Sequence, residues 1–346
     1  MKHSILIFFF FLLVAFLINV FPQKLYPVKI DGKYGFINSS GELIVKPEYI
    51  EFHRFSEGFA VVKKAKESLN GTMTDFEHGY ISTKGKYRQE NDYYKIGYYS
   101  DGLAKVYKLG IGIFKKSGWG YIDTSGTLVI PAEFYNAGDF SNGLAWVEKK
   151  EMFLFIVLSD SYGFINKTGK IVIPYQFDGT GNFSEGLANI RLNDKIGFIN
   201  KKGDLAIEPQ FENVRRFSNG CAAVMLNKKW GFINKEGILI VPATYDAVRT
   251  FTDGLAAVYI SGKWGFINHS GNLVIEAKFD DISGFNEDLC AVKIDNKWGY
   301  IDKAGKYVIK PKFDFASIFS EGIAQIRISD IHYYINRSGN IIWSSD

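Results

Sequence analysis

A short pattern of apolar and polar positions recurs along the chain. Residues 262–275 read GKWGFINHSGNLVI, and close variants stand at 227–241 (NKKWGFINKEGILIV) and 295–309 (DNKWGYIDKAGKYVI). In each variant, an aromatic-Gly-aromatic-Ile run is followed by a short polar segment that ends in glycine. A second apolar run comes after that segment. Alternation with a period of two is typical of strands that pair in a sheet.

The recurring phrase fixes a repeat of about 34 residues. The glycine that follows the first aromatic position lies 34 residues from the next one throughout the second half of the chain. A degenerate ninth copy, HYYIN, has Tyr333 in the glycine place. The first three units are longer, and we place their inserts near 63–77, 106–118 and 148–161. The eight glycines are Gly35, Gly79, Gly120, Gly163, Gly197, Gly231, Gly265 and Gly299.

Each unit predicts three antiparallel strands joined by two tight turns. An apolar run such as 255–260 is followed by two residues that tolerate positive φ, here Ser261 and Gly262, which suits a two-residue type I′ turn. The second strand is followed by three residues that end in glycine, which is typical of a turn closed by a G1 bulge. The fold class is therefore all-β, a tandem array of nine three-stranded meanders.

The connection between units contains a proline, two aromatic residues and an acid. Proline cannot donate a ladder hydrogen bond, so we expect residues such as Pro242 to end the third strand. The aromatic residues, for example Phe279 and Phe285, are predicted to bury against neighbouring meanders. The acid after the first aromatic residue, for example Asp280, is predicted to close a local Asx-type turn.

A glycine recurs in the middle of the second strand of nearly every unit. Because glycine weakens a strand, its recurrence indicates that a side chain would not fit there. Trp264 and Phe266 are predicted to point to one face and Gly265 and Ile267 to the other. We expect a close approach in which a neighbouring aromatic ring lies flat over the bare backbone. The alternative is a series of ligand pockets with Trp or Tyr floors.

The repeats resemble the WG repeat family, also called KWG repeats. The resemblance is carried by KKWGFINKEGILIVPATYD and GKWGFINHSGNLVIEAKFD, and it extends over about residues 28–343. It implies a bacterial protein, often exported, and it implies no established catalytic function. The chain departs from the pattern in its three inserts, in the units that lack tryptophan and in its degenerate last copy.

One 34-residue unit cannot bury enough surface to fold alone, so the units must stack. We favour an open, β-solenoid-like stack over residues 25–346. The alternative is a propeller-like ring.

Residues 1–24 form a separate segment. An apolar run from Ile5 to Phe21 follows Lys2 and His3 and has no polar face. This predicts an N-terminal hydrophobic helix that serves either as a signal peptide or as a membrane anchor through residues 5–21. The protein is then exported, and it is either anchored facing the periplasm or exterior or secreted.

Charge and composition exclude several classes of function. A net charge of +4 spread over 346 residues gives no reason to expect nucleic acid as a partner. The two cysteines, Cys221 and Cys290, are too few for a disulfide framework and are predicted to be small buried residues. The five histidines share no spacing suited to a metal, and no nucleophile motif occurs. We therefore expect no enzyme, no cofactor and no metal.

The inserts are the candidate binding surface. They lengthen the same hairpin in three consecutive units, so they should emerge on one edge of the array. The third insert contains seven consecutive apolar residues, 152–158, which form either a covered strand or a crest that touches a partner or a membrane. The candidate partner-binding residues are Tyr107, Trp146, Phe153, Phe155 and Ile156.

These observations predict a non-enzymatic binding or scaffold protein of the cell envelope. It would interact with a protein or a surface polymer through the edges of its repeats. A glycan-binding module is the alternative, and an uncharacterised hydrolase is a weaker one.

Overall fold

The computed structural model describes residues 24–66, 75–110, 117–153 and 156–345 of the chain. These residues form strands and turns and no helix, so the all-β prediction is confirmed. The chain divides into two compact units, Met1–Gln89 and Glu90–Asp346.

The predicted N-terminal helix lies outside the described residues, as does nearly all of the segment 1–24 to which a signal or anchor role was assigned. Within the part of the chain that the structure describes, no helix has the length and hydropathy needed to cross a membrane.

The larger unit consists of seven four-stranded antiparallel sheets. In each sheet, the second, third and fourth strands are the three predicted from one repeat, and the third carries the WG-type phrase. The second strands are β8 Leu103–Lys108, β12 Leu144–Phe153, β16 Ala188–Leu192, β20 Ala222–Leu226, β24 Ala256–Ile260, β28 Leu289–Ile294 and β32 Ile323–Ile328. The third strands are β9 Gly118–Asp123, β13 Ile156–Asn166, β17 Lys195–Ile199, β21 Lys229–Ile233, β25 Lys263–Ile267, β29 Lys297–Ile301 and β33 Ile331–Asn336. The fourth strands are β10 Leu128–Phe134, β14 Ile171–Phe177, β18 Leu205–Phe211, β22 Leu239–Tyr245, β26 Leu273–Phe279, β30 Tyr307–Phe313 and β34 Ile341–Ser344.

The first strand of each sheet comes from the connection, which was predicted to be irregular. Ala247 and Val248, for example, pair with Tyr259 and Val258 of the following strand. The prediction of three strands per sheet is therefore wrong by one. The first strands are β7 Lys95–Ser100, β11 Asn136–Ala137, β15 Gly179–Thr180, β19 Asn213–Val214, β23 Ala247–Val248, β27 Asp281–Asn286 and β31 Phe315–Ala316.

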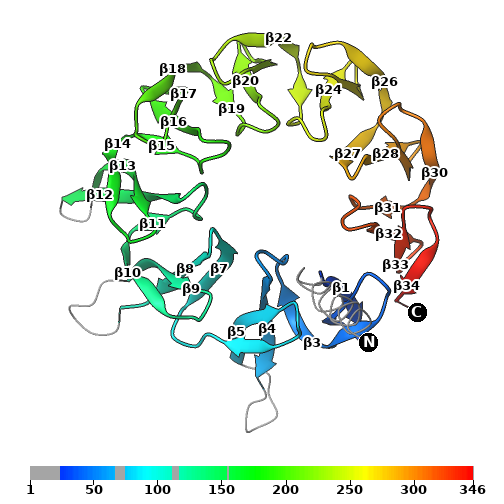
Figure 1. The fold of residues 1–346 in the computed structure, drawn as a ribbon, viewed down its shortest axis with the longest axis horizontal. Coiled ribbons are helices and arrows are strands. Elements are labelled where there is room, and N and C mark those ends of the chain that lie inside the picture. Colours follow the sequence, from blue (N-terminus) through cyan, green and yellow to red (C-terminus); the bar gives the residue numbers. More distant parts are fainter. Residues whose placement is uncertain (1–23, 67–74, 111–116, 154–155, 346) are drawn as a thin grey trace, which may run out of the picture. The chain divides into compact units, whose positions relative to one another are not determined.

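The seven sheets of this unit follow one another as the blades of a β-propeller (Figure 1). The first strands lie on the inner side of the arc and the fourth strands on the outer side (Figure 1). Most first strands have two residues and most fourth strands have seven, so the inner strand of most blades is much shorter than the outer one. The solenoid-like stack is thus not confirmed, and the arrangement is the propeller type named as its alternative.

The smaller unit is a six-stranded sheet that contains two repeats. Its third strand is long and serves both repeats, because it pairs with a strand of the first repeat on one side and of the second on the other. The two halves pack on a shared core that includes Phe36, Tyr49 and Ile81. The six strands are β1 Tyr26–Ile30, β2 Lys33–Ile37, β3 Leu43–Phe52, β4 Phe59–Lys66, β5 Asp75–Ser82 and β6 Tyr87–Gln89.

The predicted turn types are confirmed. Ser261 and Gly262 both have positive φ, 48° and 85°, as a type I′ turn requires. Gly271, which closes the turn before β26, has a φ of 78°. The side chain of Asn268 stabilises this turn by accepting hydrogen bonds from the amides of Ser270 and Asn272, both at 3.0 Å.

The strand glycine has a different neighbour from the one predicted. A Cβ atom on Gly231 would lie 2.5 Å from the carbonyl oxygen of Val241 and 2.7 Å from the nitrogen of Ala243. Both atoms belong to the backbone of β22, where the pairing with β21 shifts register at a bulge. The close approach was therefore predicted correctly, but the approaching group is bulged backbone and no aromatic ring.

The prolines of the connection lie within the fourth strands. Pro242 is the fourth of seven residues in β22, and Pro209 and Pro311 are the fifth of seven in β18 and β30. The prediction that proline ends the strand is wrong. The strand tolerates proline because it is the outer edge of its sheet and needs no further donor there.

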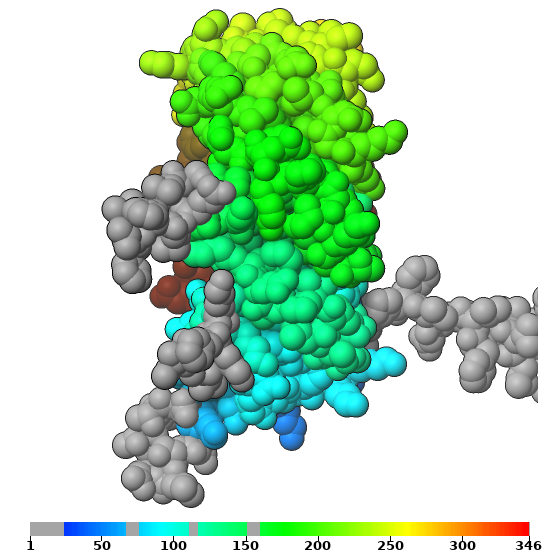
Figure 2. All heavy atoms as spheres, turned by 90° about the vertical axis from the view of Figure 1, so that its left-hand side faces the viewer, coloured from blue at the N-terminus to red at the C-terminus, as the bar shows by residue number. Residues whose placement is uncertain are grey.

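Aromatic residues of the connection fill the space between blades, as predicted. Phe251 is 1% exposed and packs in the core between the β19–β22 and β23–β26 sheets. Its ring lies 4.9 Å from that of Phe232 in an edge-to-face arrangement. Phe266 and Ile267 are adjacent in β25 yet belong to different inter-blade cores, which confirms the alternation of faces. Figure 2 shows the outer side of several blades of this unit, green to yellow, packed in sequence order.

The acid of the connection makes a contact between blades, so the prediction of a local Asx-type turn is wrong. Asp280 follows β26, and its carboxylate accepts a hydrogen bond from the amide of Asp295, 3.1 Å away in the turn of the next blade. It also pairs with Lys263, which lowers the pKa of Asp280. Asp314 repeats the pattern with Lys297 at 2.6 Å and the amide of Ser329 at 2.7 Å. We call this arrangement the acid–turn contact.

The turns between first and second strands form a second series of links between blades. The hydroxyl of Ser184 donates to the carbonyl oxygen of Phe217 in the next blade at 2.8 Å. The carboxylate of Glu185 accepts a hydrogen bond from the amide of Gly220 at 3.0 Å. Equivalent serine-to-phenylalanine bonds join Ser100 to Phe140, Ser141 to Phe183 and Ser218 to Phe251.

Candidate binding site

A cavity of about 470 Å³ lies between the blade that ends in β10 and the blade of β11–β14. This volume falls in the range of small-molecule sites. Two of the three predicted inserts contribute to its lining, through Ser117 on one side and residues 148–150 on the other. The lining residues are Ser117, Glu133, Phe134, Tyr135, Glu148, Lys149, Lys150 and Tyr175.

The third insert builds one wall of the cavity by extending a hairpin. In the β24–β25 hairpin, the chain turns at Ser261, whereas at the equivalent Lys150 the strand β12 continues and pairs with Asp160. β12 and β13 are consequently about twice as long as their counterparts. The extension places Lys150 where other blades have a turn.

Lys150 joins the polar and aromatic groups of this wall. Its ammonium nitrogen lies 4.3 Å from the centre of the Tyr135 ring. The same nitrogen is 3.8 Å from a carboxylate oxygen of Glu148 and 3.7 Å from one of Asp160. The hydrogen bond with Tyr135 is the main cause that raises the pKa of Lys150, so Lys150 is a cation at neutral pH.

Glu148 is a buried carboxylate, only 5% exposed. It stands opposite Tyr162 in the ladder between β12 and β13. Burial, and after it the negative charges of Glu148 and Asp160, raise the pKa of the Tyr162 hydroxyl. Glu148 lines the cavity, and its carboxylate is engaged within the wall by Lys150 and Tyr162.

Tyr135 occupies the place that an acid holds in other blades. It follows Phe134 as Asp280 follows Phe279, and Lys150 is the counterpart of Asp295. The acid–turn contact is therefore replaced here by a ring and an ammonium group. Tyr135 remains 54% exposed, so most of its ring is not used in packing. The acids at the equivalent place are Asp178, Glu212, Asp246, Asp280 and Asp314.

Of the residues predicted to contact a partner, Tyr107 and Trp146 are described, and neither is among the described residues that line the cavity. Tyr107 lies in β8 with its ring 5.3 Å from that of Trp119. Trp146 packs against the core between the β11–β14 and β15–β18 sheets and covers Gly138. Phe153 and Ile156 are opposite each other in the ladder, but their side chains and all of Phe155 lie outside the described part of the chain. Their role as partner contacts stays a prediction.

Sequence reasoning predicted the inserts as the binding region but missed the lining residues themselves. The signal that could have found the site is Tyr135, because it breaks the acidic position shared by five other units. Glu148 and Lys150 look like ordinary solvated charges in the sequence, and only the extended ladder brings them together.

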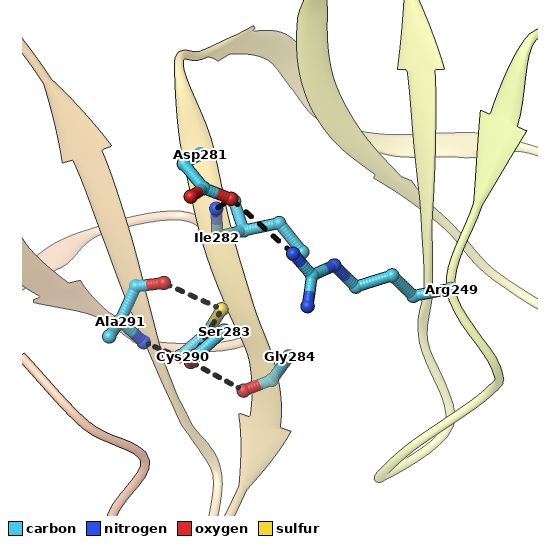
Figure 3. A network of polar contacts seen from close by, with 7 residues as sticks. All are labelled: Arg249, Asp281, Ile282, Ser283, Gly284, Cys290 and Ala291. Carbon is cyan, nitrogen blue, oxygen red and sulfur yellow. Dashed lines mark hydrogen bonds and ion pairs between the residues drawn. The ribbon is translucent and has the colours of Figure 1, made fainter.

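No group of three or more His, Cys, Asp or Glu side chains suited to a metal ion occurs among the described residues. Cys221 and Cys290 are both free and buried, as predicted. The Cys290 sulfur donates to the carbonyl oxygen of Ala291 at 3.3 Å and lies 3.9 Å from the hydroxyl of Ser283 (Figure 3). Arg249 reaches this inner strand from the preceding blade and pairs with Asp281 at 3.3 Å (Figure 3).

We expect both thiols to be unreactive in the folded protein. Burial raises the pKa of Cys290 to about 11 and also raises that of Cys221, so the reactive thiolate is scarce at pH 8. Ellman's reagent at pH 8 should label neither cysteine within minutes, and both in denaturant. Rapid labelling of the native protein would contradict the burial of these groups.

The comparison with protein families agrees with this architecture. The family model described as "WG containing repeat" matches residues 34–66, 119–152, 162–195, 196–230, 230–264, 264–298 and 298–330, which together make up more than half of the chain. The chain belongs to the WG repeat family. The resemblance inferred from the sequence is thus confirmed, and the WG repeat matches leave out the units of Gly79 and Tyr333.

Solved structures resemble this WG repeat protein only distantly. AztD of Citrobacter koseri is 12% identical, with a TM-score of 0.38 over 82% of this chain and 92% of its own. Hsv2p of Kluyveromyces lactis is 10% identical, with a TM-score of 0.39 over 86% and 96%. PorZ of Porphyromonas gingivalis, a surface component of a type-IX secretion system, is 10% identical, with a TM-score of 0.34 over 92% of this chain and 52% of its own. No curated protein matches the chain. At these values we carry no function over from any of them.

Proposed function

We propose that this WG repeat protein is a non-enzymatic binding scaffold that holds a protein or a surface polymer at the edge of its blades that carries the inserts. The observation that supports this most strongly is the cavity of about 470 Å³ to which two inserts contribute. The regular blades provide a rigid frame, and the inserts add the variable chemistry at one place on it.

The chemistry of the lining supports a binding role over a catalytic one. Among the described residues that line the cavity, Ser117 is the single aliphatic hydroxyl, and none is a histidine or a cysteine. Lys150 is engaged by Glu148, Asp160 and Tyr135, so its charge stabilises the wall. A nucleophile with an adjacent base and an orienting group, as covalent catalysis needs, is not assembled there.

The proposed location is the cell envelope. The apolar run from Ile5 to Phe21 would export the chain, and it would also hold it on the membrane if it is not cleaved. Mass spectrometry of the mature N-terminus, combined with fractionation of the producing cells, tests this part of the proposal. Full-length protein in the cytosolic fraction would contradict it.

The binding role is tested with envelope material from which membranes have been removed by detergent, so that an anchor cannot contribute. Purified full-length chain in detergent should co-sediment with this material. Tyr135→Ala should reduce the bound fraction at least tenfold, because it removes the exposed ring of the cavity. Tyr94→Ala is the matched control, since Tyr94 is 61% exposed and does not line the cavity. Absence of binding, or equal binding by Tyr135→Ala, would refute the proposal.

A further inference from the structure

We propose that the cavity beside β12 binds a neutral oligosaccharide. This inference rests on the proposed function in one respect, namely that this cavity is the place where the partner is held. It goes further by assigning the chemical class of the ligand from the charges and rings of the lining.

The charges of the site disfavour an anionic ligand. Glu133 and Glu148 line the cavity, and Asp160 lies beside it on the ammonium of Lys150. Lys150 is already held by two of these carboxylates, which leaves Lys149 as the only other cation of the lining. A ligand with a negative charge would meet more like charge than opposite charge, and such a juxtaposition is costly.

A cationic ligand is disfavoured for a different reason. An organic cation binds best over the face of an aromatic ring with a carboxylate close by. In this cavity, Lys150 of the protein itself holds that position, with its nitrogen 4.3 Å from the centre of the Tyr135 ring and 3.8 Å from Glu148. A second ammonium group would have to displace it.

A neutral sugar fits what remains. One face of a pyranose ring carries mainly C–H groups, which are slightly positive and pack on the negative face of an aromatic ring. Tyr135 is 54% exposed although Lys150 lies over one side of its ring, and Tyr175 provides a second, half-buried ring. The hydroxyl groups at the rim of a sugar both donate and accept, so they suit a lining that contains both acidic and basic residues, such as Glu133 and Lys149.

Comparison between blades shows that Tyr135 stands where other blades have an acid. After β26, the place equivalent to Tyr135 is held by Asp280. Its carboxylate accepts a hydrogen bond from the amide of Asp295 in the turn of the next blade and pairs with Lys263 of β25. Tyr135 makes neither of these bonds. Its ring lies instead beside the ammonium group of Lys150, and the residue is 54% exposed. A half-exposed aromatic ring that lines a cavity, at a place where other blades have an acid, supports a ligand-binding role.

Isothermal titration of the full-length chain tests the inference with three tetrasaccharide probes and one amine. The neutral probes are cellotetraose and the tetramer of N-acetylglucosamine, the anionic probe is tetragalacturonate, and the cationic probe is spermidine. We expect at least one neutral probe to bind and the charged probes to bind at least tenfold more weakly. Tyr135→Ala should weaken binding of the neutral probe at least tenfold, whereas Tyr135→Phe, which keeps the ring, should stay within about threefold.

Thermal denaturation of each variant checks that it is folded. Tyr94→Ala is the control variant, because it removes a tyrosine that does not line the cavity. Binding by no neutral probe, tighter binding of tetragalacturonate or spermidine, or unchanged binding by Tyr135→Ala would each overturn the inference. If the envelope material still binds the chain in a Tyr135-dependent way while no neutral sugar does, the saccharide assignment fails and the binding role stands. If the envelope material does not bind either, both fail.

Discussion

Replacing Phe251 with alanine is expected to lower the free energy of unfolding of the larger unit by about 3–5 kcal/mol. The ring is 1% exposed and joins two blades, because it packs edge-to-face on Phe232 and stacks on His269, 4.2 Å away. The backbone around it is held by a hydrogen bond from Ser218, so the blades cannot easily close over the space left behind. Urea denaturation followed by tryptophan fluorescence and circular dichroism measures the loss.

Phe315→Ala is the matched control. This phenylalanine is 41% exposed at the start of an inner strand, so its removal should cost about 1 kcal/mol or less. Equal losses in the two variants would show that the Phe251 ring does not join the blades as described.

Gly231→Ala is expected to destabilise the protein by about 1–3 kcal/mol, although alanine usually suits a strand better than glycine. The added Cβ would lie 2.5 Å from the carbonyl oxygen of Val241 and 2.7 Å from the nitrogen of Ala243. Both are backbone atoms of the bulge in β22, and the strand can move away only by breaking its ladder with β21. The midpoint of urea denaturation reports the change.

Gly179→Ala serves as its control, since Gly179 is also a strand glycine. An added Cβ there would meet the Cβ of Arg191 at 3.5 Å, an ordinary contact. We expect no loss, or a gain of about 0.4–1 kcal/mol from the less flexible unfolded chain. If Gly231→Ala were as mild as this variant, the bulge would not be the reason for the repeated glycine.

Much of the blade could be predicted from the sequence because its signals are local. The pair Ser261-Gly262 and the glycine at 271 specify their turns through φ alone, and the alternation of Phe266 and Ile267 assigns them to opposite faces. The first strand, Ala247–Val248, could not be predicted in this way, since two residues show no periodicity. Without that strand, the sequence did not reveal the four-stranded sheet that is typical of a propeller blade.

The candidate site was less accessible to sequence reasoning because it depends on contacts that are distant in the chain or unusual in type. Asp280 was assigned to a local turn, whereas its partner is the amide of Asp295 in the next blade. Because the role of this acid was unknown, the presence of Tyr135 at the equivalent place did not indicate a binding site. The region of the inserts was predicted because extra length shows directly in the spacing of the glycines.

In the part of the chain that follows the inserts, the links between neighbouring blades repeat at a constant spacing, and this makes the number of blades adjustable. Ser184 bonds to Phe217, and Ser218 bonds to Phe251, each 33 residues further on. Loss of one 34-residue unit between them would bring Ser184 against the carbonyl oxygen of Phe251, a joint of identical chemistry. A gene that gains or loses whole units by recombination would therefore encode chains with different numbers of blades. The serine-to-phenylalanine hydrogen bonds between neighbouring blades would form in each of them without any change of residues.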